Sequence, residues 1–269
     1  MDSTVPAVVA DALPEATVSS VETTATGNTK RTAFVSLADG RDLVVQTRPT
    51  DGRAATGAGP GAAVGAGLAT EARLAREVSR RTEVPVPRVL VAGTVDGVEY
   101  LIAERAPGED LHARFVDLPP EVRGSVVRSM GRWLADLHAA FEFDGYGPVV
   151  EDDGRLVVAD PATDWWAWFG EYVEWALSRL CDGGIEGLVD LVPRVRATVD
   201  AGLSDLPTDP PARLFPWDLR PGNATVADGA VTALLDWGDP LAAARGLSVA
   251  KAAYVTVDWY LAGTATDRL

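Results

Sequence analysis

Alternating apolar and polar positions organise the first hundred residues of the chain. Two such runs, residues 32–37 and 42–47, flank the turn Asp39-Gly40. Apolar strands joined through an Asp-Gly turn are typical of a β-hairpin. Two further strand-like runs follow at residues 88–93 and 99–104. The pattern therefore predicts a small antiparallel sheet in this part of the chain.

Helical and loop patterns interrupt these strands. Residues 71–81 form a charged amphipathic segment with Leu74 and Val78 on one face, which predicts a helix. Residues 50–70 consist largely of Gly and Ala without a hydrophobic period, which predicts a flexible loop. Residues 1–20 alternate short apolar and acidic stretches, a pattern compatible with a short helix and its cap.

Beyond Pro107-Gly108 the periodicity becomes helical. Residues 122–141 keep an apolar stripe at the 3.6-residue spacing of a helix. We expect an α+β protein in two parts, residues 1–105 with strands and one helix, and residues 106–269, mainly helical. The other elements predicted in the second part are helices at residues 161–180 and 190–203, short strands at 212–215 and 231–235, and a helical piece at 254–261.

Composition limits the class of protein. The 269 residues are 47% hydrophobic and 23% charged, which is typical of a soluble globular protein. The single cysteine, Cys181, excludes an internal disulfide and a cysteine-based zinc site. The start Met1-Asp2-Ser3 lacks a basic segment, and no run of about 18 apolar residues follows. We therefore expect a cytoplasmic protein that neither enters the secretory route nor spans a membrane.

Charge is the most unusual property of the composition. The 39 acidic residues against 24 Lys and Arg give a net charge of −15. A field of this sign repels nucleic acids and anionic membranes, so we expect neither as a partner. The only lysines are Lys30 and Lys251. An acidic, lysine-poor surface is typical of proteins from salt-loving archaea; a GC-rich genome is the alternative explanation.

Two segments in the C-terminal part carry side chains suited to phosphoryl transfer. The first contains Asp218, Arg220 and Asn223, and the second places Asp236 after an apolar strand. Transfer to a hydroxyl needs a carboxylate that accepts its proton, and oxygen ligands that hold Mg²⁺ on the nucleotide phosphates. Asp218 fits the first role, and Asn223 and Asp236 fit the second. Arg220 could neutralise the charge of the transferred group.

Simpler interpretations exist for several of these residues. Asp and Asn are common at turns, and Arg220 could be an ordinary surface arginine. Glu71 could simply complement the N-terminal dipole of its helix. The tryptophans within residues 165–175 are interpreted as packing, with a cation-binding cage as the alternative. His138 is interpreted as structural. The joint spacing of the acidic and amide side chains favours the functional interpretation over the turn.

These motifs resemble a known family. The segment Pro-Trp-Asp-Leu-Arg-Pro-Gly-Asn at residues 216–223, followed by Leu-Asp-Trp-Gly-Asp at 235–239, resembles the aminoglycoside phosphotransferase and choline-kinase-like family, a branch of the protein-kinase-like fold. The resemblance runs from about residue 27 to about residue 260 and includes residues 84–90, 100–111 and 134–138. It implies a two-lobe fold, with a small antiparallel β-sheet N-lobe and a larger, mainly helical C-lobe.

The resemblance also implies a nucleotide, ATP or GTP, bound with Mg²⁺ between the lobes. Its base would hydrogen-bond the backbone around Glu104 and Ala106. The turn at Gly27 and Asn28 would cover the phosphates. Glu71 would be the helix acid that braces a lysine on a neighbouring strand.

The chain departs from the family pattern at several positions. Gln46 stands where the strand lysine is expected, and a neutral amide binds phosphate more weakly than an ammonium group. Arg48 shares its strand face but would replace the lysine only if the strand register slipped. Pro216 and Trp217 replace the usual His and Gly of the catalytic loop, and Ser248 stands near a position that often carries an aspartate.

The combined pattern predicts an Mg-dependent kinase that moves the γ-phosphoryl group of ATP or GTP to a hydroxyl of a small molecule. An acidic cleft would suit a cationic acceptor such as an aminosugar or amino alcohol, but drug resistance does not follow from the fold. The alternative is a catalytically impaired, kinase-like module that binds a nucleotide or metabolite. Gln46 and Pro216 favour that alternative.

Overall fold

A computed structural model of the chain describes residues 4–24, 30–50, 67–182 and 189–262. The expected turn at Gly27 and Asn28 and most of the expected loop at 50–70 lie outside the described residues.

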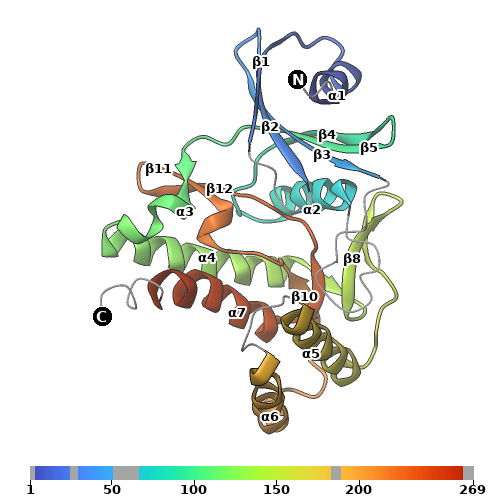
Figure 1. Cartoon of the computed structure of the whole chain (residues 1–269), viewed down its shortest axis with the longest axis vertical. Helices are drawn as coiled ribbons and strands as arrows, with labels where there is room; N and C mark the ends of the chain where they lie inside the picture. Colours follow the sequence, from blue (N-terminus) through green and yellow to red (C-terminus); the bar gives the residue numbers. More distant parts are fainter. Residues whose placement is uncertain (1–3, 25–29, 51–66, 183–188, 263–269) are drawn as a thin grey trace.

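A five-stranded antiparallel sheet with a helix on each face forms the N-terminal part (Figure 1). The strand order is β1-β2-β3-β5-β4. Its elements are α1 (Thr4–Ala12), β1 (Val18–Thr23), β2 (Arg31–Leu37), β3 (Asp42–Pro49), α2 (Leu68–Arg81), β4 (Val89–Val95) and β5 (Val98–Glu104).

The alternation of side chains along β3 assigns different environments to the two faces of this sheet. Leu43 and Val45 are buried on the face that packs against Val8 and Val9 of α1. The intervening Val44 and Gln46 point to the opposite face, which also carries α2. The sheet thus presents a half-buried, partly polar surface toward the rest of the molecule.

The C-terminal part combines helices with short sheets. One sheet has the strand order β7-β10-β13-β8-β9, and another has the order β12-β11-β6. The strands are β6 (Glu109–Asp110), β7 (Glu142–Phe143), β8 (Gly147–Asp152), β9 (Arg155–Val158), β10 (Ala212–Phe215), β11 (Ala224–Ala227), β12 (Ala230–Leu234) and β13 (Leu241–Ala244). The helices are α3 (Leu111–Arg114), α4 (Pro120–Ala140), α5 (Trp165–Asp182), α6 (Val192–Gly202) and α7 (Arg245–Ala253), and Tyr254–Ala262 continues α7 as a π-helix.

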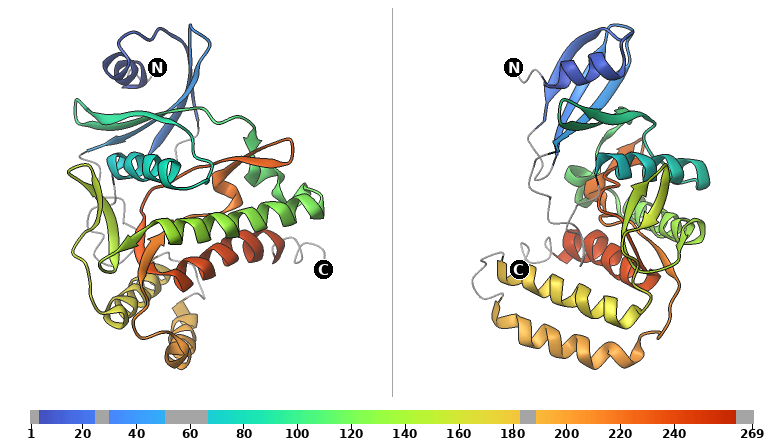
Figure 2. Two further views of the ribbon diagram at one scale, coloured as in Figure 1. Left: turned by 180° about the vertical axis from the view of Figure 1, so that it is seen from behind. Right: turned by 90° about the vertical axis from the view of Figure 1, so that its right-hand side faces the viewer.

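One hydrophobic core joins the two parts. Leu74 and Val78 of α2 pack in the same cluster as Leu137 of α4, Leu214 of β10 and Leu234 of β12. Figure 2 shows α5 and α6 at the end of the molecule opposite α1, with α4 and α7 between them and the first sheet. The shared core therefore holds α2 in place beside the loops that follow β10 and β12.

The mixed α+β architecture predicted from the sequence is confirmed. The expected strands and the helices at 71–81, 122–141, 161–180 and 190–203 all occur, within a few residues of their predicted ends. Three features differ from the expectation. β1 and α7 were not anticipated, and the C-terminal part contains a five-stranded sheet. Helix α1 lies within residues 1–20, whose pattern was compatible with a short helix.

None of the helices within the described residues is both long enough and apolar enough to cross a lipid bilayer.

A glycine in the connection between β5 and β6 supplies a test of how closely this connection approaches the backbone of β11. Gly108 has a φ of 101°, and a Cβ atom there would lie 2.4 Å from the carbonyl oxygen of Val226. Gly108→Ala should destabilise the protein by about 1–2 kcal/mol through its backbone conformation, and by about 1–3 kcal/mol more through the clash. Urea unfolding monitored by tryptophan fluorescence measures the loss.

Gly40→Ala is the matched control. Gly40 has a φ of 89°, but no atom of the described residues lies within 4 Å of the position that a Cβ atom would take there. This variant should lose only the conformational contribution. Equal losses for the two variants would contradict a close backbone approach at Gly108.

Candidate active site

A short loop between β10 and β11 brings three of the sequence-predicted side chains together. The Arg220 Nε atom donates a hydrogen bond of 2.8 Å to Oδ2 of Asp218. The Asn223 Nδ2 atom donates to the same oxygen at 3.0 Å and to the Asp218 backbone oxygen at 2.9 Å. A single 3-10 turn, Pro221–Asn223, positions Asn223 for this contact.

Asp236 joins this group from the loop that follows β12. The Leu235 N–H donates to the carbonyl oxygen of Asn223 at 2.7 Å, which ties the two loops together. Asp236 has a φ of 60°, a left-handed conformation that costs energy in a residue other than glycine and is common at functional sites. Asp218, Asn223 and Asp236 line one small cavity, so the three residues expected to act together do converge.

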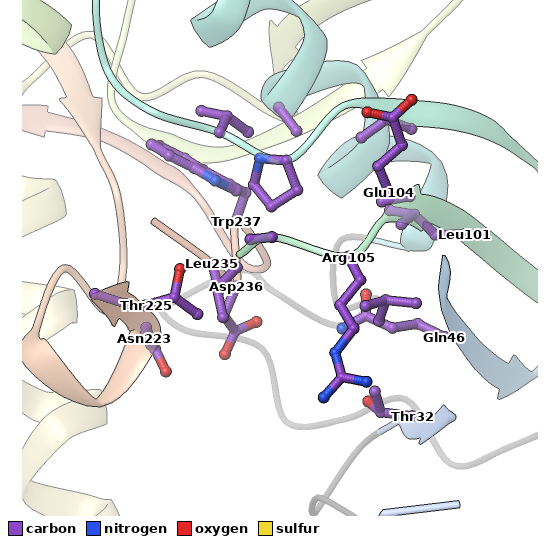
Figure 3. A pocket seen from close by; sticks show the side chains of 18 of the residues that line it. Thr32, Gln46, Leu101, Glu104, Arg105, Asn223, Thr225, Leu235, Asp236 and Trp237 are labelled. Carbon is purple, nitrogen blue, oxygen red and sulfur yellow. The ribbon is translucent and has the colours of Figure 1, made fainter. Parts of the chain in front are cut away.

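A larger cavity of about 770 Å³ opens between the first sheet and these loops. Its walls include Val44 and Leu101 from the sheet and Leu235 from the C-terminal part. Figure 3 shows Asn223 and Asp236 on one side of this cavity and Gln46 and Thr32 on another. The space is large and apolar enough for a cofactor-sized ligand, and it has a charged end at Glu71 and Asp236.

A lysine that the sequence analysis did not place at the site lies at that charged end. The Lys30 ammonium group is 2.7 Å from both carboxylate oxygens of Glu71 and 2.9 Å from Oδ1 of Asp236. Lys30 directly precedes β2, whereas Glu71 lies in the first turn of α2. Glu71 thus braces a lysine as the family resemblance implied, but this lysine comes from β2 rather than β3.

Burial and charge shape the protonation of this cluster. The Glu71 side chain is only 8% exposed, and this burial raises its pKa, with Lys30 acting in the opposite direction. Burial lowers the pKa of Lys30, but the carboxylates of Glu71 and Asp236 outweigh it and leave the pKa above its usual value. Lys30 therefore remains a cation at neutral pH, and the backbone N–H of Trp237 also stabilises the Glu71 carboxylate.

Gln46 and Arg48 lie where the strand pattern predicted, but only Gln46 lines the cavity. The register of β3 is regular: Gln46 is opposite Thr32 of β2, and Arg48 is opposite Glu99 of β5. Arg48 forms an ion pair with Glu99 at 2.9 Å. The register slip that would have brought Arg48 into the lysine position does not occur.

The segment after β5 also lines the cavity, through Glu104, Arg105 and Ala106. The backbone N–H of Glu104 donates to Arg88 O, and that of Arg105 donates to Asp42 O, each at 2.9 Å. The Arg105 guanidinium group lies 4.0 Å from the centre of the Phe34 ring.

The second lysine of the chain lies on the other side of Asp218. Lys251 of α7 packs its ammonium group over the ring of Trp217, 3.1 Å from the ring centre. Trp217 continues an aromatic series that runs through Trp175 and Tyr172 into α5. The aromatic cluster is thus packing, as interpreted from the sequence, and the cation over Trp217 belongs to the chain itself.

His138 and Ser248 form a structural pair beneath the site. The His138 Nε2 atom and the Ser248 hydroxyl lie 2.7 Å apart, and the hydroxyl donates its own proton to Arg245 O at 2.9 Å. Nε2 is therefore the donor in the shorter bond. Burial and the nearby Arg245 and Arg213 lower the pKa of His138 to about 4, so it is neutral at pH 7. This agrees with a structural role for His138.

Loop acids, an asparagine and a lysine beside a cofactor-sized cavity are typical of phosphotransferases with a kinase-like fold. A sequence model of the phosphotransferase enzyme family (APH) matches residues 20–255, and the chain belongs to this family. No curated protein matches the sequence.

Solved structures with the same fold are similar to most of the chain. A thermostable mutant of aminoglycoside phosphotransferase APH(4)-Ia in complex with AMP-PNP and hygromycin B has a TM-score of 0.64 at 18% identity, over 92% of this chain and 75% of that one. A putative fructosamine-3-kinase from Thermobifida fusca has a TM-score of 0.62 at 23% identity, over 96% and 80%. The macrolide 2'-phosphotransferase MphH from Brachybacterium faecium has a TM-score of 0.58 at 18% identity, over 97% and 79%. At these identities the likeness establishes the protein-kinase-like fold.

The burial of Lys251 leads to a testable pH dependence. Burial, followed by the charge of Arg220, lowers the pKa of Lys251 to about 8, although Asp218 opposes the shift. The ordinary value of 10.5 applies to the unfolded chain. Between these values the unfolded chain binds more protons, so this lysine makes the free energy of unfolding rise with pH. Lys251→Met lacks this contribution. From pH 8 to pH 10 the free energy of unfolding of the wild type should therefore rise relative to that of the variant.

Urea unfolding of both proteins at pH 7.5, 8.5 and 9.5 measures this difference. Arg179→Met, which removes a cation from the last turn of α5, is the control and should follow the wild-type profile. Parallel profiles for Lys251→Met and the wild type would contradict a lowered pKa for Lys251.

Proposed function

We propose that the protein is an Mg-dependent small-molecule phosphotransferase that moves the γ-phosphoryl group of ATP or GTP to a substrate hydroxyl. The observation that carries this proposal is the convergence of Asp218, Asn223 and Asp236 on one cavity beside the larger pocket. Family membership supports the reaction class. Relatives with AMP-PNP, ADP or GDP in their structures support a nucleotide co-substrate.

Asp218 is the proposed base. Arg220 and Asn223 both donate to its Oδ2 atom, which orients the carboxylate and leaves Oδ1 for the acceptor hydroxyl. As the hydroxyl oxygen attacks the γ-phosphorus, the bond from that phosphorus to the β–γ bridging oxygen breaks and ADP or GDP leaves, while the hydroxyl proton passes to Oδ1 of Asp218. Arg220 also brings a positive charge close to the transferred group.

Asn223 and Asp236 are the proposed magnesium ligands. The Asn223 amide nitrogen donates to Asp218, so the amide oxygen is the atom left to coordinate a metal. The Asp236 side chain is 44% exposed toward the pocket. This donor set fits magnesium, which prefers oxygen ligands and needs few from the protein when phosphates and water supply the rest. When bound, Mg²⁺ would neutralise the charge that develops on the phosphates.

The pocket of about 770 Å³ is the proposed nucleotide site. Val44 and Leu101 would flank the base, and the backbone at Glu104 and Ala106 would hydrogen-bond its edge. Because the Glu104 N–H already donates to Arg88, the N–H of Ala106 is the better candidate for this contact. The turn at Gly27 and Asn28 remains the proposed cover of the phosphates.

The division into lobes follows from the same proposal. Residues 1–105 would form the nucleotide-binding lobe, since the first sheet ends at Glu104, and residues 106–269 would form the catalytic and substrate lobe. A cytoplasmic location and a small-molecule hydroxyl substrate are parts of the same proposal. The net charge of −15 argues against nucleic acid or a membrane as partner.

The acceptor class stays open within this proposal. Hygromycin B and kanamycin occur in the complexes of solved relatives, and an acidic cleft would favour such amino compounds. However, Arg220 and Lys251 both lie near Asp218 and make its immediate surroundings positive. An acceptor panel should therefore include hydroxy acids and sugar phosphates beside aminosugars and amino alcohols.

A binding module without turnover is the second candidate. Pro216 in the catalytic loop and Gln46 in β3 favour it. The intact hydrogen bonds around Asp218 favour the enzyme, because positioning and metal electrostatics supply most of the catalysis in this reaction class.

Asp218→Asn tests the enzyme proposal. With ATP or GTP, Mg²⁺ and the acceptor panel, in low and high KCl, the wild type should transfer phosphate. The variant should lose roughly 10²–10⁴-fold in kcat, because a neutral amide cannot accept the hydroxyl proton. Its Kd for Mg-nucleotide should stay within about threefold. Phosphate transfer from radiolabelled nucleotide and titration calorimetry measure the two quantities.

Asp228→Asn is the matched control. Asp228 lies in the tight turn between β11 and β12, outside the residues that line the two cavities, and Asn tolerates its φ of 51°. The control should keep wild-type kcat. Nucleotide binding by the wild type without transfer to any acceptor, unchanged in Asp218→Asn, would favour the binding module.

Asp236→Ala tests the metal proposal separately. Removing this carboxylate should weaken nucleotide binding roughly tenfold or more in the presence of Mg²⁺ and much less in EDTA, because only the metal-bound nucleotide uses Asp236. Calorimetric titrations with and without Mg²⁺ measure both values. An equal loss in the two conditions would contradict a role in metal binding.

A further inference from the structure

The buried carboxylate of Glu71 needs a cation, and the expected position for one holds none. Gln46 occupies the β3 position where the resemblance implied a lysine, and its side chain is uncharged. A carboxylate that is 8% exposed is strongly destabilised unless a positive group compensates it. The partner that compensates Glu71 in this chain is Lys30.

Lys30 reaches this point because of the geometry of the first sheet. In the β2–β3 pair, Thr32 is the direct partner of Gln46. Lys30 lies two residues before Thr32, so it shares the sheet face of Thr32 and is the diagonal neighbour of Gln46. Lys30, Thr32 and Gln46 all line the large cavity. A long side chain from Lys30 can therefore deliver its ammonium group to the space that a lysine at position 46 would occupy.

Two other nearby cations have partners other than Glu71. Arg48, on the same face of β3, pairs with Glu99 at 2.9 Å. Arg105 lines the same cavity, and its guanidinium group lies 4.0 Å from the centre of the Phe34 ring. Among the described residues, Lys30 is the cation that bridges Glu71 and the proposed metal ligand Asp236.

From this geometry we infer that Lys30 is the phosphate-binding lysine of the protein and has replaced the missing lysine of β3. The inference rests on the proposed function. Glu71 holds the ammonium group beside Asp236, where the phosphates of a metal-bound nucleotide would lie. Gln46 is then a neutral neighbour, and replacing it should weaken nucleotide binding little. Lys30 supplies the positive charge that β3 lacks.

The three N–H groups of Lys30 indicate how it would engage a nucleotide. These three groups match three acceptors, the two oxygens of Glu71 and Oδ1 of Asp236. The Glu71 side chain is buried, whereas that of Asp236 is 44% exposed. The contact with Asp236 is therefore the one that would exchange for a phosphate oxygen, while the contact with Glu71 is kept.

Nucleotide binding by Lys30→Met tests the inference without relying on turnover. The ligands are AMP-PNP and GMP-PNP with Mg²⁺, and the matching nucleosides adenosine and guanosine. Lys30→Met should weaken binding of the preferred triphosphate analogue roughly tenfold to a hundredfold, the loss expected for hydrogen bonds to a charged group. Binding of the nucleoside should change less than about threefold, because it has no phosphate.

Three further variants sharpen the test. Arg31→Met removes a neighbouring cation from the strand position that faces away from the cavity, and it should bind like the wild type. Gln46→Met should lose less than about threefold. Lys30→Met combined with Gln46→Lys should recover at least half of the loss on a logarithmic scale, since the ammonium group returns from the diagonal position. If Lys30→Met fails to fold because Glu71 is left uncompensated, Lys30→Met with Glu71→Gln replaces it.

The outcomes separate this inference from the proposed function. Unchanged binding of the triphosphate analogue by Lys30→Met, or equal weakening for analogue and nucleoside, would overturn the inference even if the wild type transfers phosphate. Selective weakening of the analogue would support it even if the wild type transfers none. A wild type that binds none of these ligands would overturn both.

Discussion

A buried acid between the first sheet and the loop that follows β12 is the constraint on which the site depends. Glu71 lies in the first turn of α2, and its carboxylate is tolerated only because Lys30 and the backbone N–H of Trp237 compensate it. Lys30 in turn binds Asp236, so one ammonium group connects the start of β2, helix α2 and the loop after β12. The hydrophobic core shared by α2, α4, β10 and β12 holds these elements at the distances that the charge cluster requires.

The charges at the site are more evenly balanced than those of the whole chain. The protein carries a net charge of −15, yet both of its lysines and Arg220 gather around the acids of the two loops. These cations offset the mutual repulsion of Asp218, Asp236 and Glu71 before any metal or phosphate is present. An acidic exterior with a compensated interior cluster is suited to a ligand that is itself anionic and enters together with a divalent cation.

The catalytic loop keeps its shape by different contacts from those its family motif implies. Pro216 and Trp217 stand where His and Gly are usual, and Trp217 is supported by Lys251 from α7 and by Trp175 from α5. Below it, Ser248 pairs with neutral His138. Packing around Trp217 and a neutral hydrogen bond thus support the loop in place of the usual His and Gly. The hydrogen bonds of Arg220 and Asn223 to Asp218 remain. The departures from the motif therefore concern the support of the site more than its reacting groups.

The sequence by itself determined the features that depend on short spacings. Strand alternation and helical stripes predicted most elements, and the five-residue interval from Asp218 to Asn223 was enough to predict their proximity, because one turn of chain joins them. It did not indicate β1, whose side chains are largely exposed, or α7, which is short and rich in alanine. Only the tertiary structure decided which cation serves Glu71. Lys30 lies 41 residues from Glu71 and 206 from Asp236, and the choice between β2 and β3 follows from strand register and side-chain reach, which pattern and spacing along the chain do not encode.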